Sequence, residues 1–279
     1  MLSDGYLHNT IRYIPGLCAR SLGECVTLAI VKLFSAFLLL AVPLPGAEVS
    51  MGHLHIFSRN VPTQRLFLVN VLGGKDSGLL GDNVLVRFPD VLILVKGGDP
   101  VGGTVESTVQ HVGFKVKSLD HYRDKLGSAG LKFEENAQTR QINVLGPDGI
   151  KIELTEDTTL KVPIVNHHIH FYTADITVTQ AWYVKTFGAV AGKRGKFEAA
   201  DLPGVNLSFS SGLGTAPTKG RSLDHIAFQV KDLENFCRTL EAQGVKFESP
   251  YKTVPSLGMS NAFLKDPFGT LVELTEGLK

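Results

Sequence analysis

Residues 223–233 read LDHIAFQVKDL and residues 110–119 read QHVGFKVKSL, so one stretch of the chain repeats an earlier one. Each copy runs on to a similar ending, DPFGTLVELTE at 266–276 and GPDGIKIELTE at 146–156. Two further stretches, GHLHIF at 52–57 and HHIHFY at 167–172, open units of the same kind. We therefore interpret the chain as four related units that begin near residues 51, 109, 166 and 223.

Each unit has the pattern of a strand, a helix and three more strands. In the last unit, alternation places Ile226 on the strand face opposite His225. Asp232 can cap the helix that follows, and Gly244 can end it. Ser118 is the matching cap in the second unit. The three later strands of the last unit are expected at 245–247, 262–264 and 271–274.

The boundaries between units are marked by glycine and by polar residues. Glycine-rich joints at 97–103 and 211–217 separate the units inside each half of the chain. Residues 157–163 form a short linker between the halves. We therefore expect two domains, at 51–157 and 164–277, each built from two units.

This quartet of βαβββ units resembles the vicinal oxygen chelate superfamily, which includes glyoxalase I, fosfomycin-resistance proteins, methylmalonyl-CoA epimerase, bleomycin-binding proteins and extradiol dioxygenases. The resemblance covers about residues 51–277. It implies an α+β fold of two tandem domains, in each of which a pair of βαβββ modules closes into a cupped mixed sheet. It also implies that metal ligands project into the cup from the first and last strands of the modules.

The composition is compatible with two such domains and argues against a nucleic-acid partner. The 279 residues are 43% hydrophobic, which is enough for two cores of ordinary size. The formal net charge is +1, and no basic stripe suggests binding to nucleic acid. Cys18 and Cys25 precede the domains, so Cys237 alone lies inside them and no disulfide framework is expected there. The oligomeric state stays open.

Residues 1–47 have the features of a leader. The apolar run at 33–42 is typical of the hydrophobic region of a signal peptide, and cleavage is expected between about Ala47 and Met51. The mature protein would then be secreted or periplasmic and free of the membrane. Two alternatives stay open: a retained membrane anchor, or translation from Met51 and a cytoplasmic protein.

Histidine and glutamate recur at positions that suit a metal site. Strand alternation turns His168, His225 and Glu273 away from the apolar layer. Two imidazoles and one carboxylate form a facial triad that leaves positions open for substrate, which favours Fe(II) or Mn(II), with Zn(II) or Ni(II) as alternatives. The first half repeats the set. The predicted metal ligands are His168, His225 and Glu273 in the second half, and His53, His111 and Glu153 in the first.

Two further histidines lie beside these ligands. His170 and His55 each stand two residues past a proposed ligand on the same strand face, where a neutral imidazole could act as a general base. The alternative is a hydrogen-bonded structural histidine. Glu156 and Glu276 are expected to be solvated charges at strand ends. Residues 193–196 are either an ordinary basic loop or part of the lining for an acidic substrate.

The resemblance narrows the chemistry only in part. Glyoxalases and epimerases have a fourth ligand at the position that Ser208 and Leu94 occupy here, and neither is a strong ligand. The ending at 266–273 matches the extradiol dioxygenase signature, but Ser260 and Phe263 stand where that signature has a histidine and a tyrosine. Catechol cleavage by the usual route is therefore in doubt.

Two functions from different classes remain. The first is a divalent-metal enzyme that acts on a small substrate with two adjacent oxygens, by oxygenation or by proton transfer. The second is a metal-free protein of the bleomycin-resistance type that binds or sequesters a small ligand. The substrate, the metal and the number of active halves are not determined by the sequence.

Overall fold

Four successive βαβββ units make up the fold, as the repeat predicts. The structure is a computed structural model that describes residues 48–212 and 215–278. The predicted leader with its expected signal peptide lies outside the described residues, as do Cys18 and Cys25. In the described part no helix is long and apolar enough to cross a membrane.

The first two units contain eight strands and two α-helices, the first of which continues into a π-helical turn at Phe67–Val71. Their elements are β1 (Val49–Ser58), α1 (Val61–Leu66), β2 (Lys75–Leu80), β3 (Asn83–Phe88), β4 (Val91–Gly97), β5 (Val109–Val116), α2 (Leu119–Ser128), β6 (Phe133–Asn136), β7 (Gln141–Leu145) and β8 (Lys151–Glu156). A short 3-10 turn at Pro147–Gly149 precedes β8.

The last two units repeat this order. Their elements are β9 (Ile164–Thr173), α3 (Ile176–Phe187), β10 (Val190–Arg194), β11 (Phe197–Leu202), β12 (Val205–Ser211), β13 (Leu223–Val230), α4 (Leu233–Ala242), β14 (Phe247–Val254), β15 (Met259–Lys265) and β16 (Leu271–Glu276). A second 3-10 turn at Pro255–Leu257 joins β14 to β15.

Of the two predicted helix caps, the structure confirms the one at the start of α2 and not the one at the start of α4. The Ser118 side chain accepts a hydrogen bond from the backbone N–H of His121, as expected. Asp232 makes no such bond and has a left-handed backbone. The Glu276 carboxylate instead accepts the N–H groups of Asp232 and Leu233. The Asp232 cap was therefore wrong.

Glu156 has the same role in the second unit. One of its oxygens accepts the N–H of Leu119 at 2.9 Å, at the start of α2. Glu156 and Glu276 were expected to be solvated charges, and this was also wrong. Each carboxylate reaches across from the last strand of its unit to the positive end of the helix, where unpaired N–H groups favour an anion.

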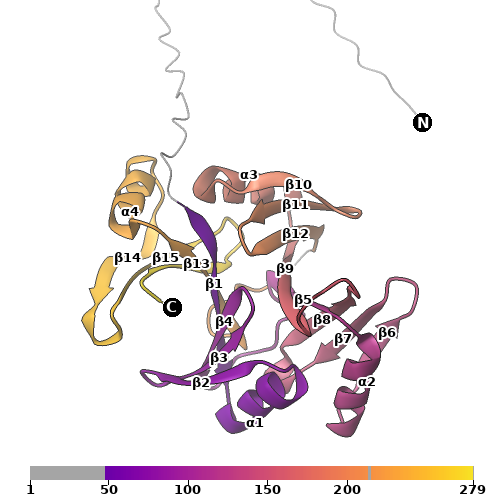
Figure 1. Cartoon of the computed structure of the whole chain (residues 1–279). Helices are drawn as coiled ribbons and strands as arrows, with labels where there is room; N and C mark the ends of the chain where they lie inside the picture. Colours follow the sequence, from indigo (N-terminus) through magenta and orange to yellow (C-terminus); the bar gives the residue numbers. More distant parts are fainter. Residues whose placement is uncertain (1–47, 213–214, 279) are drawn as a thin grey trace, which may run out of the picture. The chain divides into compact units, whose positions relative to one another are not determined.

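The strands form two eight-stranded mixed sheets, which confirms the predicted fold class. The first sheet has the order β14-β15-β16-β13-β1-β4-β3-β2, and the second has the order β10-β11-β12-β9-β5-β8-β7-β6. Antiparallel pairs join the units at the centre of each sheet, β1 with β13 and β5 with β9. Figure 1 shows β1 between β13 and β4.

The pairing of units differs from the predicted domains. Unit 1 pairs with unit 4 and unit 2 pairs with unit 3, so 51–157 and 164–277 each supply one unit to each sheet. The expectation that each half closes its own sheet was wrong. The loop between β4 and β5 is hydrogen-bonded to the loop between β12 and β13: Val101 N–H donates to Gly220 O, and Thr108 N–H donates to Ala216 O. Gly103 lies so close to Gly149 that a Cβ would collide with its carbonyl oxygen.

The apolar faces of both sheets belong to one continuous core. Phe114, Leu154, Phe228 and Leu274 are all fully buried, as predicted. Aromatic pairs connect units of different sheets, with ring centroids 5.1 Å apart for Phe88 and Phe114 and also for Phe187 and Phe228. Each such side chain contributes about 1.5–3 kcal/mol by burial. Cys237, on α4, is also buried and is the free cysteine of the described residues.

Candidate functional site

The first sheet brings four ligand-type side chains together at its centre. They are His53 and His55 on β1, His225 on β13 and Glu273 on β16, and we call them the β1/β13 site. One donor atom from each lies within 4.8 Å of the others. Strand alternation explains the convergence, because the neighbours Leu54 and Ile226 point into the apolar core.

Glu273 is the centre of this cluster. Its Oε2 atom lies 3.0 Å from His53 Nε2 and 3.0 Å from His225 Nε2. His55 Nδ1 lies 3.2 Å from His225 Nε2, so His55 is closer to the ligands than its place along the strand suggested. His53, His225 and Glu273 are buried, and His55 is partly buried.

Two side chains orient the ligand residues His225 and Glu273 through hydrogen bonds. Asp224 Oδ1 accepts a hydrogen bond from His225 Nδ1 at 2.6 Å, which leaves Nε2 to face Glu273. Asn261 Nδ2 donates to Glu273 Oε1 at 2.8 Å, which leaves Oε2 to face the histidines. A carboxylate behind a histidine is the arrangement that orients metal-binding imidazoles and makes them more basic.

A bulge in β13 explains why sequence reasoning missed Asp224. Strand alternation places adjacent residues on opposite faces, yet Asp224 contacts the ring of His225. In the β1/β13 ladder His55 pairs with His225 and Ile56 pairs with Leu223, so Asp224 is the extra residue. Bulges of this kind redirect a side chain beside functional sites. Gln110 is the extra residue of the matching bulge in β5.

The charges of the β1/β13 site match what a metal ion needs. Burial lowers the pKa of His53 and lowers that of His55 to about 3, so both rings are neutral near pH 7. Burial would raise the pKa of Glu273, but its hydrogen bond with His225 and the nearby His53 ring hold it well below its usual range. Burial would lower the pKa of His225, but hydrogen bonds to Asp224 and Glu273 raise it.

His53 also gives a direct test of whether a metal fits. Neither of its ring nitrogens makes a hydrogen bond, although both are buried, because the approach of Nε2 to Glu273 lacks hydrogen-bond geometry. Unpaired buried polar atoms are rare and costly in folded proteins. Two imidazoles and a carboxylate that converge in this way are a donor set that fits a divalent ion.

A pocket of about 280 Å³ opens onto the β1/β13 site. Apolar side chains dominate its walls around the four ligand-type residues. The other lining residues are Leu80, Asn83, Leu94, Lys252, Val254, Leu257, Met259, Asn261, Phe263 and Leu278. A small, largely apolar chamber with a few convergent polar groups is typical of a small-molecule site.

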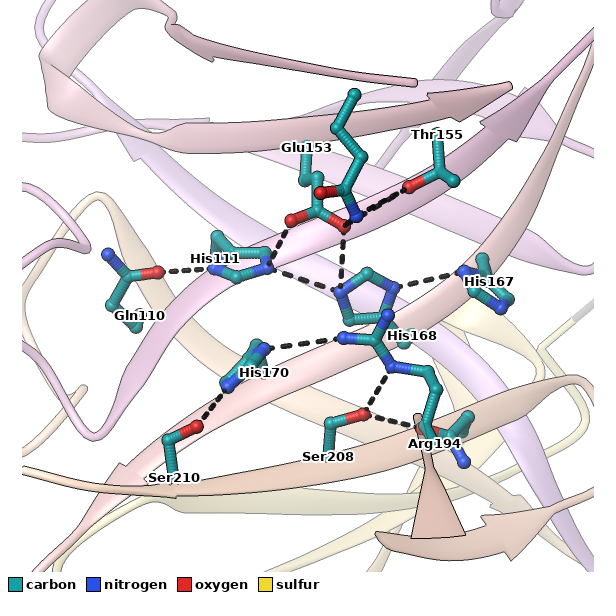
Figure 2. A network of polar contacts seen from close by, with 12 residues as sticks. Gln110, His111, Glu153, Thr155, His167, His168, His170, Arg194, Ser208 and Ser210 are labelled. Atoms are coloured by element: carbon teal, nitrogen blue, oxygen red, sulfur yellow. Dashed lines mark hydrogen bonds and ion pairs between the residues drawn. The ribbon is translucent and has the colours of Figure 1, made fainter. Parts of the chain in front are cut away.

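The second sheet contains a related cluster, the β5/β9 site. Its members are His111 on β5, Glu153 on β8, and His168 and His170 on β9 (Figure 2). His111 Nε2 lies 3.1 Å from His168 Nε2. The Glu153 oxygens lie 3.5 Å from His111 and 3.6 Å from His168, farther than Glu273 lies from its histidines.

The surroundings of the β5/β9 site differ from those of the first. Gln110 takes the place of Asp224 and contacts His111 Nδ1. The His168 ring packs so closely on Gly113 that a Cβ there would overlap it. Burial raises the pKa of Glu153, whereas Glu273 is held ionised by its two histidines.

The structure exchanges one histidine between the two predicted ligand sets. His225 and Glu273 lie together, but their partner is His53 and not His168. His168 lies with His111 and Glu153. The predicted groupings were therefore wrong, although all six residues lie in the two clusters. The cause is the pairing of β1 with β13 and of β5 with β9.

The structure also shows where the four residues that differ from the glyoxalase and extradiol dioxygenase patterns lie. Leu94 pairs with His55 and Ser208 pairs with His170, so each lies beside the second histidine of its site. Phe263 packs against His225 with ring centroids 5.3 Å apart. Ser260 lies 3.3 Å from the Tyr251 hydroxyl.

We predict that the metal-free protein loses stability when the pH falls below about 6.5. Burial lowers the pKa of His111 to about 2 and that of His167 and His170 to about 4. Between these values and 6.5, the unfolded chain takes up protons that the folded chain does not, so stability falls with pH. Each histidine contributes on the order of 1.4 kcal/mol per pH unit.

Urea midpoints of chelator-treated protein at pH 7, 6 and 5 measure this effect. His167→Asn should show a shallower decline than the parent, because one of the buried imidazoles is gone. Equal midpoints at all three pH values would contradict the prediction.

Comparisons with known proteins agree with the fold. A sequence model described as the Glyoxalase/Bleomycin resistance protein/Dioxygenase superfamily matches residues 166–274. No match was found among curated protein sequences. Glyoxalase I from Zea mays is 15% identical with a TM-score of 0.66, over 82% of this chain and 93% of that chain. A Bacillus subtilis protein described as a candidate dioxygenase is 15% identical with a TM-score of 0.61, over 82% of this chain and 86% of that chain.

At these identities the two solved structures show a shared fold, and the sequence model shows a similarity to the superfamily in one segment of the chain. Its match begins at Asn166, on β9, and ends at Leu274, on β16, so it covers most of units 3 and 4. The order of strands and helices in units 1 and 2 is the same. Residues 166–274 therefore match the sequence model of the glyoxalase/bleomycin resistance protein/dioxygenase superfamily, and the chain shares the fold of glyoxalase I.

Proposed function

We propose that the chain is an enzyme that holds one divalent metal ion at His53, His225 and Glu273. The observation that carries this proposal is the position of Glu273 Oε2, 3.0 Å from two imidazole nitrogens, one of which is backed by Asp224. Fe(II) and Mn(II) suit this set best, with Zn(II) and Ni(II) as alternatives. Glyoxalase I of Zea mays, an enzyme by its name, shares the fold.

We propose that the substrate is a small molecule with two adjacent oxygens. Three protein ligands leave positions open on the ion, and two neighbouring oxygens of a substrate can fill them. When bound, such a metal ion acts as a Lewis acid on these oxygens and makes an adjacent C–H group more acidic. The pocket of about 280 Å³ limits the substrate to a small molecule, and leucine side chains form part of its walls.

His55 is the residue proposed to move the proton. It lines the pocket, and its Nε2 atom is buried without a hydrogen-bond partner. The pKa of about 3 keeps its ring neutral near pH 7, so it can take up a proton at a ring nitrogen. Phe263 and Ser260 provide no acid or base of the extradiol kind, which favours proton transfer over oxygenation.

Solvent exchange of the carbon-bound protons of hydroxyacetone in D2O tests the proposal without the natural substrate. Hydroxyacetone has oxygens on two adjacent carbons, and the C–H group on the carbon that bears the hydroxyl is acidic because the carbonyl is next to it. Metal-loaded protein should accelerate the exchange measured by NMR, and chelator-treated protein should not. His55→Gln should keep its metal and lose about 10²–10⁴-fold of the rate, the usual contribution of a positioned base.

Binding of acetohydroxamate, a chelator with two adjacent oxygens, distinguishes a metal enzyme from a metal-free ligand-binding protein. With Co(II) as the bound ion, acetohydroxamate should change the visible spectrum, and acetamide, with one oxygen, should not. If metal-loaded protein shows neither exchange nor this spectral change, the enzyme proposal fails. The metal-free ligand-binding protein then takes its place.

A further inference from the structure

The two sites differ at positions that correspond in the two sheets. Arg194 ends β10 and pairs with Phe197, whereas Leu80 ends β2 and pairs with Asn83. Ser208 stands beside His170 where Leu94 stands beside His55. The β5/β9 site therefore has a cation and a hydroxyl where the β1/β13 site has two leucines.

Arg194 occupies the space next to the β5/β9 histidines (Figure 2). Its Nε donates to Ser208 Oγ at 2.7 Å, and its Nη2 lies 3.4 Å from His170 Nδ1. A guanidinium can only donate, so His170 Nδ1 accepts and the ring proton is on Nε2. That Nε2 donates to Ser210 Oγ at 2.7 Å. Both ring nitrogens of His170 therefore have a hydrogen-bond partner, and neither is free to bind a metal ion.

Positive charge exceeds negative charge around this site. Besides Arg194, the lining of its pocket includes Lys151 and Lys196, and Glu153 is the one carboxylate of that lining. In the part of the chain that the structure describes, no carboxylate lies within ion-pair distance of Arg194, whereas the neighbouring Lys193 pairs with Glu198 at 2.9 Å. A second cation would be repelled here, and an anion would be attracted.

The pocket itself suits an organic anion with a flat apolar part. It measures about 650 Å³, more than twice the pocket of the β1/β13 site. The Phe197 ring lies among the cations, 5.5 Å from the Arg194 guanidinium and 5.4 Å from the Lys196 ammonium. Gln141 and Asn143 also line this pocket; the Gln141 amide donates to Glu153 and Thr155, and the Asn143 amide can donate to an oxyanion.

From this geometry we infer that the β5/β9 site binds a small organic carboxylate, with Arg194 as the residue that recognises its charge and Phe197 as the surface for its planar group. A planar guanidinium fits a carboxylate through two parallel hydrogen bonds. The inference assigns different ligands to the two sheets, a metal ion to the first and an anion to the second. It does not depend on the metal proposed for the β1/β13 site.

Calorimetric titration of the full chain with benzoate tests this inference. Benzoate should bind, and benzamide, its uncharged analogue, should bind at least about tenfold more weakly, because it lacks the charge that Arg194 recognises. Inorganic phosphate should also bind more weakly, because it has no ring to pack on Phe197. Arg194→Gln should weaken benzoate binding by about thirtyfold or more, while Arg194→Lys should keep part of it.

Lys193→Gln is the matched control, since Lys193 is the adjacent cation and does not line this pocket. It should bind benzoate like the parent. His225→Ala should also bind benzoate like the parent, so a failure of the metal proposal leaves this test intact. Equal binding of benzoate and benzamide, or of parent and Arg194→Gln with an unchanged circular dichroism spectrum, would overturn the inference. So would a second equivalent of bound metal that His111→Ala removes.

Discussion

The His225→Ala variant is expected to lower the metal bound per chain from about one equivalent to less than about a tenth, since ligand loss costs more than the 10–100-fold loss typical of residues behind the ligands. His225 supplies one of the two imidazole nitrogens that lie 3.0 Å from Glu273 Oε2. The two remaining groups cannot enclose the ion. Protein loaded with Fe(II), Mn(II), Zn(II) or Ni(II) and freed of excess metal by gel filtration gives the stoichiometry by elemental analysis.

Three further variants serve as comparisons for this measurement of bound metal. Asp224→Asn removes only the carboxylate behind His225, so metal affinity should fall by about 10–100-fold while the site can still fill at high metal concentration. His121→Ala changes an exposed histidine on α2 and should bind metal like the parent. His111→Ala reports on the β5/β9 site. A parent protein with less than about a tenth of an equivalent of any of the four metals would refute the metal centre, since two imidazoles and a carboxylate held together in this way should retain the ion.

A chain cut in the linker between Lys161 and Val162 is expected to stay together as one particle. The two halves share both sheets, through the β1/β13 pair in one and the β5/β9 pair in the other. Lys161 and Val162 are exposed, so a protease site inserted there can be cut without disturbing the core. Size-exclusion chromatography after cleavage should show the mass of the intact chain, and the two pieces should separate only in denaturant.

Residues 48–157 alone should not give a folded monomer. Without the second half, β1 and β5 lose their central partners, and unpaired strand edges are prone to association. Circular dichroism melts of the isolated piece should lack the cooperative transition of the cut and uncut whole chain. Separation of the two pieces under native conditions, each with its own cooperative melt, would contradict the pairing of units.

Local features of the fold were readable in the sequence. Alternation along residues 223–230 and 110–116 identified strands with one apolar face, and the repeat identified four βαβββ units. Phe114 and Phe228 were expected in the core and are fully buried. These features depend on neighbours along the chain, and their spacing therefore predicts them.

The partners of each unit were decided by tertiary structure. All four units begin with the same kind of strand, so the pattern allows unit 1 to pair with unit 2 or with unit 4. Hydrogen bonds between the β4–β5 loop and the β12–β13 loop, such as Val101 with Gly220, accompany the pairing that forms. The exchange of His53 and His168 between the ligand sets follows from it. No local pattern could predict that exchange, because the residue types are the same in both sets.

The sequence also did not predict the roles of residues whose contacts lie far away along the chain. Glu276 holds the start of α4 from a strand more than forty positions away, while the adjacent Asp232 does not cap it. Arg194 looked like part of a basic loop until β12 placed Ser208 against it. The sequence by itself determined the four units and the ligand residue types, because short-range alternation and repetition encode them. Tertiary structure alone decided which ligands meet and which site carries a cation, because both depend on strands that pair far apart in the chain.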